Sequence, residues 1–259
     1  MFVITFVSLV IISSLLLARG FFPKSTLTDP KDNTQYELDD QEQTDSATGL
    51  QLRTLKLKEC KNAVAVDMLL DRSASMQEQN KMTKLKEAAN GFTSNLSDNS
   101  LIGIQSFSSS GISNDVPISL YASVKPLVGS AINGLRPSGA TPTKDALEFT
   151  QKILADAVQK YPGKNFVLIF VSDGAPCPGV GCPEAPGANQ DPALYTPNPA
   201  SEIKSLGVTI YTIAIGTDSL NSVMSGIASS PDTMFNAPTG AELKSIYDKI
   251  ATRLCNKVN

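Results

Sequence analysis

An acidic side chain and two hydroxyls follow directly on an apolar run of the sequence. The run covers residues 63–70, and Asp71, Ser73 and Ser75 come after it in the pattern DRSAS. Carboxylate and hydroxyl oxygens are ligands for hard cations such as Mg²⁺, Mn²⁺ and Ca²⁺. The pattern therefore indicates either an oxygen-lined cation site or a turn in which serines cap the following helix.

Two further oxygen-bearing residues stand in comparable places. Asp173 follows the apolar run 166–171 and precedes Gly174, which permits a tight turn. Thr141 lies in the loop 138–143, which contains glycine and proline and precedes a segment of helical period. Histidine is absent from the whole chain. Relays of the Ser-His-Asp or Cys-His type are therefore excluded, and so are imidazole metal ligands.

The elements that must position these residues alternate along the chain. Short runs that are apolar on both faces predict buried strands, and the segments between them have a helical period. The predicted strands are 63–70, 101–107, 166–171 and 208–215. The predicted helices are 81–96, 123–135, 143–160, 199–206 and 241–254. This order predicts an α/β fold, a doubly wound and mostly parallel sheet flanked by helices on both faces. Ligands of such sheets bind at the carboxyl ends of the strands, where Asp71 and Asp173 are expected.

The three elements DxSxS, a threonine in a GxTP-like loop and the aspartate of SDG resemble the metal-ion-dependent adhesion site (MIDAS) of von Willebrand factor type A domains. The resemblance covers about residues 57–259. It implies that Ser73, Ser75 and Thr141 supply hydroxyl ligands, while Asp71 and Asp173 bind directly or through water. The ion would be Mg²⁺, or Mn²⁺ or Ca²⁺, and an open coordination position would take a carboxylate from a protein partner.

One residue departs from the family pattern. Ala140 stands where many relatives carry a second glycine, which changes the freedom of the loop and not the type of ligand.

Two other functions remain open. A metal-free scaffold would interact through the proline-rich insertion 175–199, because long irregular loops are usually functional. A phosphatase with an aspartate nucleophile would need a second acid two residues after Asp71, where the chain has Ser73. A GxxxxGK[ST] phosphate loop is also missing from the sequence, so we expect no catalysis.

The apolar N-terminal segment predicts that the protein is exported from the cytoplasm. Residues 1–20 are mostly apolar and form a signal peptide or a membrane anchor. Residues 21–56 are predicted to be a polar, acidic linker, and residues 57–259 the folded domain. With a net charge of −3 and no basic stripe, the chain is not expected to bind nucleic acid.

Four cysteines agree with an oxidising compartment. Cys60 precedes the first core strand and Cys255 ends the last helix, so a Cys60–Cys255 disulfide is reasonable where the ends of the domain meet. Type A domains that this chain resembles often carry such a clasp; two buried free thiols are the alternative. Cys177 and Cys182 flank a short turn, which favours a local disulfide.

Together these features predict a non-enzymatic binding module, secreted or tethered to the membrane by residues 1–20. Its expected setting is adhesion or assembly at the cell surface.

Overall fold

The computed structural model describes residues 63–173, 198–216 and 221–256, together with four short strands nearer the N-terminus. The chain divides into two units, Met1–Lys58 and Glu59–Asn259. In the first unit, β1 (Thr26–Thr28) pairs with β2 (Gln35–Glu37), and β3 (Glu42–Thr44) pairs with β4 (Gln51–Arg53), both antiparallel. Two-stranded ribbons of this length are only marginally stable on their own, so they do not by themselves make a folded domain. That residues 21–56 form a linker remains a prediction.

The second unit is built on a six-stranded sheet with the order β10-β9-β8-β5-β6-β7. Its strands are β5 (Ala65–Asp71), β6 (Leu101–Ser108), β7 (Gly111–Leu120), β8 (Phe166–Ser172), β9 (Thr209–Ile215) and β10 (Met234–Ala237). The pairs are parallel except β7, which runs antiparallel to β6. The predicted α/β fold with a mostly parallel sheet is therefore confirmed.

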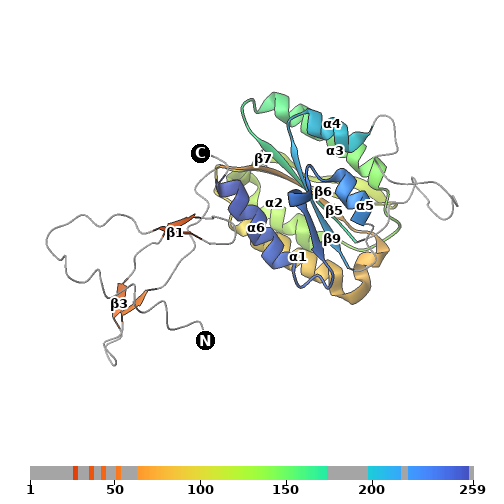
Figure 1. The fold of residues 1–259 in the computed structure, drawn as a ribbon. Coiled ribbons are helices and arrows are strands. Elements are labelled where there is room, and N and C mark those ends of the chain that lie inside the picture. Colours follow the sequence, from red (N-terminus) through yellow and green to blue (C-terminus); the bar gives the residue numbers. More distant parts are fainter. Residues whose placement is uncertain are drawn as a thin grey trace. The chain divides into compact units, whose positions relative to one another are not determined.

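Helices cover both faces of this sheet (Figure 1). On one face lie α1 (Lys81–Ser94), α2 (Tyr121–Gly134) and α6 (Leu243–Asn256), and on the other lie α3 (Thr143–Lys160), α4 (Pro199–Ser205) and α5 (Asn221–Ile227). Successive residues of β5 point to opposite faces, so Met68 packs in one core cluster and Leu69 in the other. This double burial explains why the strand reads as a continuous apolar run.

The central position of β5 determines where its last residue lies. Ala65 pairs with both Leu101 of β6 and Phe166 of β8, so the three strands start at one level and end together. The end of β5 at Asp71 and the end of β8 at Ser172 therefore share one edge of the sheet.

Several predictions fall outside the described residues. These are the segment 1–20, most of the insertion 175–199, and the side chains of Cys60, Cys177, Cys182 and Cys255. Both predicted disulfides remain predictions. Within the described part of the chain, no helix has the length and apolar character needed to cross a bilayer.

Candidate functional site at the carboxyl edge of the sheet

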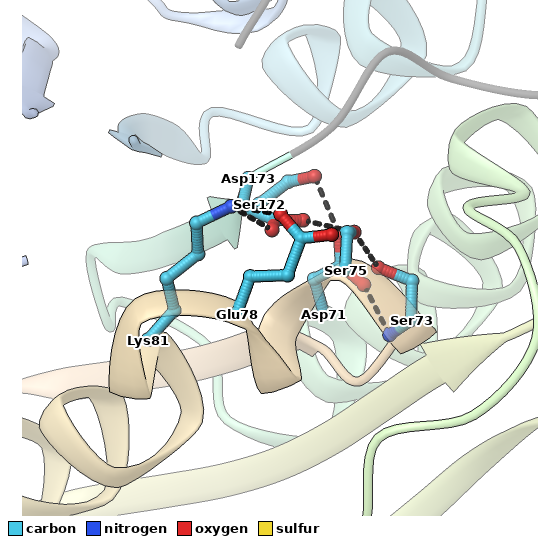
Figure 2. Close-up of polar contacts among 7 residues, drawn as sticks. All are labelled: Asp71, Ser73, Ser75, Glu78, Lys81, Ser172 and Asp173. Atoms are coloured by element: carbon cyan, nitrogen blue, oxygen red, sulfur yellow. Dashed lines mark hydrogen bonds and ion pairs between the residues drawn. The ribbon is translucent and has the colours of Figure 1, made fainter. Parts of the chain in front are cut away.

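Asp71 is the last residue of β5, and its side chain is completely buried. Its Oδ1 accepts a hydrogen bond from the backbone N–H of Ser73 at 2.7 Å, and its Oδ2 accepts one from the Ser172 hydroxyl at 2.6 Å. The first bond fixes the turn that leaves the strand, and the second ties β5 to the end of β8 (Figure 2). Asp71 is thus held by both of its oxygens.

The two serines of the DRSAS pattern do not act as helix caps. Ser73 occupies the N-cap position of the 3₁₀ segment η2 (Ala74–Asn80), but its side chain makes no capping hydrogen bond. Its hydroxyl lies 3.1 Å from that of Ser75, which donates to Oδ1 of Asp173 at 2.8 Å (Figure 2). The Ser75 hydroxyl is directed toward the second aspartate and the Ser73 hydroxyl toward Ser75, so capping does not account for them.

Asp173 follows β8 and is 1% exposed. Its Oδ2 accepts a hydrogen bond from the Lys81 ammonium at 2.8 Å, and Lys81 itself is buried. Sequence reasoning placed Lys81 only at the start of a helix and missed this contact. The sequence carries no signal for it, because the backbone turn before the helix determines where the lysine points.

The loop that carries Thr141 is bound to the DRSAS turn through its backbone. Gly139 accepts a hydrogen bond from the Ala74 N–H at 2.8 Å, and Ser138 donates one to the Arg72 carbonyl at 2.8 Å. Thr141 is 5% exposed, and among the described residues no hydrogen bond joins its hydroxyl to the serine pair. The structure thus brings the loop to the site, while the ligand role of Thr141 remains a prediction.

Gly139 and Ala140 precede Thr141 in this loop, and Ala140 is the residue that departs from the family pattern. Gly139 has a φ of +70°, and a Cβ there would lie 2.5 Å from the Ser109 hydroxyl, so glycine is needed. Ala140 donates its N–H to that same hydroxyl at 2.7 Å and accepts from the Ser109 N–H at 2.8 Å. The backbone of Ala140 is therefore held by one hydrogen bond to a side chain and one to the backbone of Ser109.

The family model of the von Willebrand factor type A domain matches residues 66–249. The chain belongs to this family. Among curated protein sequences, none gives a significant match.

Solved structures share the fold at low sequence identity. Proximal thread matrix protein 1 from the mussel byssus, with a zinc-occupied MIDAS motif, is 20% identical at a TM-score of 0.60, covering 76% of this chain and 47% of that one. The pilus adhesin SpaC of Lactobacillus rhamnosus GG is 18% identical at 0.61, covering 75% and 30%. An aerotolerance-related membrane protein of Bacteroides fragilis is 16% identical at 0.54, covering 76% and 100%. The chain thus spans about half the length of the byssus protein.

The donor set of this type A domain suits a hard cation. The pKa of Asp71 is raised to about 6, chiefly by burial and also by the neighbouring charge of Asp173, while the hydrogen bonds from Ser172 and Ser73 lower it. Two buried carboxylates that repel each other gain from a cation between them. Among the described residues no three acidic or cysteine side chains cluster, so the remaining donors here are hydroxyls. The residues present therefore fit a divalent ion such as Mg²⁺.

The same geometry disfavours a phosphatase. A nucleophilic carboxylate must contact its substrate directly, but Asp71 is fully buried and both of its oxygens accept hydrogen bonds. A carboxylate in this position can still hold a dication through water. Ser73 cannot replace the second acid, because a hydroxyl does not protonate a leaving group at neutral pH.

Proposed function

We propose that this type A domain is a non-enzymatic binding module in which a divalent cation engages a carboxylate of a protein partner. Asp71, Ser73, Ser75, Thr141 and Asp173 would hold the ion, directly or through water. The observation that carries the proposal is the hydrogen-bonded network of two buried aspartates and two serines at the carboxyl edge of the sheet.

The neutral and the charged residues would play different roles in holding the ion. Neutral serine and threonine hydroxyls coordinate Mg²⁺ without cancelling its charge, and the two aspartates balance it. The bound ion would supply a Lewis-acidic position for the partner's carboxylate. Because Ser172 and the Ser73 N–H already orient Asp71, and Ser75 orients Asp173, the chain presents its oxygens without a large rearrangement.

The proposed setting is adhesion or surface assembly outside the cell, with the protein secreted or tethered by residues 1–20. The apolar N-terminal segment and the even number of cysteines support export. The fold is shared with a pilus adhesin and a byssus matrix protein, which is consistent with this setting.

Calorimetric titration with MgCl₂ tests the metal half of the proposal. We expect saturable binding to the wild-type domain, and its loss in Asp71→Ala and in Ser73→Ala. Ser113→Ala is the matched control, because that hydroxyl bonds to Asp115 on the edge strand β7, outside the site. Circular dichroism in EDTA checks that each variant is folded. A folded wild-type domain that takes up no Mg²⁺, Mn²⁺ or Ca²⁺ would instead support the metal-free scaffold.

A small dicarboxylate tests the partner half. We expect glutarate to shift NMR signals of the domain in the presence of Mg²⁺ and not in EDTA, whereas the uncharged diamide shifts none. Equal shifts with and without the metal would show that the carboxylate binds elsewhere.

A further inference from the structure

Lys81 is an unusual residue to find inside a cation site, because a buried ammonium loses its hydration. It is the first residue of α1 and is 3% exposed. Gln79 and Asn80 before it have φ values of +51° and +60°, so the chain turns sharply between η2 and α1. This turn directs the lysine inward to Asp173 (Figure 2).

The Lys81 ammonium lies in a space that a side chain at position 216 would narrow. Gly216, which follows β9, has no side chain, and a Cβ there would lie 3.1 Å from Cε and 3.4 Å from Nζ of Lys81. On the other side, Oε2 of Glu78 lies 3.9 Å from Nζ, but this side chain is 65% exposed and its charge is screened by water. Asp173 is therefore the main partner of the lysine charge.

Lys81 and Ser75 bind different oxygens of the Asp173 carboxylate. Oδ2 accepts from Lys81, while Oδ1 accepts from Ser75. The ammonium thus neutralises one of the two buried carboxylates through the oxygen that faces away from the serine pair.

We propose that Lys81 is a built-in counter-cation of the site, which weakens metal binding and strengthens capture of the partner's carboxylate. This inference rests on the proposed function. Lys81 and the divalent ion are attracted by the same aspartates, so each positive charge lowers the attraction for the other. With the ion bound, the two aspartates are balanced by it, and the lysine leaves one net positive charge to attract an acid.

Replacing the lysine by a neutral side chain therefore moves the two affinities in opposite directions. In Lys81→Met we expect Mg²⁺ to bind at least about tenfold more tightly and glutarate to bind the Mg²⁺-loaded domain more weakly. A purely structural role for the lysine would loosen the site and weaken both affinities. Lys81→Gln, which keeps a hydrogen-bond donor but removes the charge, should show the same two changes.

The experiment compares the wild type, Lys81→Met, Lys81→Gln and the control Lys244→Met by Mg²⁺ calorimetry and by glutarate NMR titration. Lys244 forms an exposed pair with Asp248 on α6, so its replacement removes the same charge outside the site. We expect the control to behave as the wild type.

The outcomes separate this inference from the proposed function. If the wild type binds Mg²⁺ and both Lys81 variants bind it equally or less tightly, the counter-cation role is wrong and the metal site stands. If only the variants bind Mg²⁺, the lysine replaces the metal in the wild type, so its weakening of metal binding holds, while the proposed function and the carboxylate half of the inference both fail. If no protein binds Mg²⁺, both fail. Variants that fold only when Mg²⁺ is added support the inference, and variants that stay unfolded with Mg²⁺ overturn it.

Discussion

Asp67 is a buried acid in the middle of β5, away from the strand end that carries the site. Its Oδ2 accepts a hydrogen bond from the Gln105 amide, whose Oε1 accepts one from the Thr150 hydroxyl at 2.7 Å. Oδ1 of Asp67 has no hydrogen-bond partner among the described residues. Burial raises the pKa of Asp67 from 3.8 to about 7, and the hydrogen bonds from Gln105 and the backbone of Met68 oppose the rise.

The sign of the effect on stability follows from this direction. The folded state holds the proton more tightly than the unfolded state, so the fold loses stability as the pH rises from about 4 to about 7 and is level above that range. A difference of about three pKa units, at about 1.4 kcal/mol each, gives a total loss of about 4 kcal/mol. About 3 kcal/mol of it falls between pH 5 and pH 8.

Asp67→Asn removes the titrating proton while keeping the shape of the side chain. We expect the free energy of unfolding of this variant to fall by about 3 kcal/mol less than that of the wild type between pH 5 and pH 8. Urea unfolding at a series of pH values in EDTA measures it. A constant change in hydrogen bonding cancels in the comparison between pH values, and the contribution of Asp71 is common to both proteins.

Asp156→Asn is the control, because it makes the same substitution at a side chain that is exposed on α3, outside the core. Wild-type and Asp67→Asn profiles that run parallel from pH 5 to pH 8 would refute the reasoning, since the buried carboxyl would then be without influence on the pH dependence.

Two further substitutions test the packing around the sheet. Gly103→Ala would place a Cβ in overlap with Oδ1 of Asp67 and 2.6 Å from Cγ1 of Ile118, so we expect a loss of about 1–3 kcal/mol in urea unfolding. Gly91→Ala in α1 meets nothing within 4 Å and should be neutral or stabilising; equal losses in both would contradict the overlap. Asn198→Ala removes the side-chain cap that accepts two backbone N–H groups of α4, and we expect a loss of about 1 kcal/mol, whereas Asn198→Asp should retain most of the stability.

The strands that the sequence predicts are those buried on both faces. The run 166–171 lies within β8, in which every residue is buried, so hydrophobicity alone locates it. The edge strand β7 escaped prediction because only Val116 and Ile118 among its residues are buried, and Pro117 interrupts the pattern. Pro is tolerated there because an edge strand leaves one side of its backbone unpaired. The short elements α5 and β10 were missed for lack of a long periodic pattern.

The placement of the site followed from topology. Asp71 ends β5 and Asp173 follows β8, and because parallel neighbouring strands end at one edge of the sheet, the sequence alone predicts that the two aspartates lie close together. The contact of the DRSAS turn with the loop 138–143 depends on backbone hydrogen bonds between distant segments, which no local pattern encodes.

The net charge of the candidate site is the property that the sequence predicts least well. Read from the sequence, the motif contributes two acids and no base, which describes a site with strong attraction for a dication. In the structure Lys81 joins it from ten residues beyond Asp71, because the left-handed backbone of Gln79 and Asn80 turns a helix start inward. When the Lys81 ammonium balances the negative charge of Asp173, the attraction of the two carboxylates for a cation falls and the net charge facing a partner becomes more positive. The net charge of this candidate site therefore includes every buried charge that contacts its two aspartates, and the residues of the motif alone do not give it.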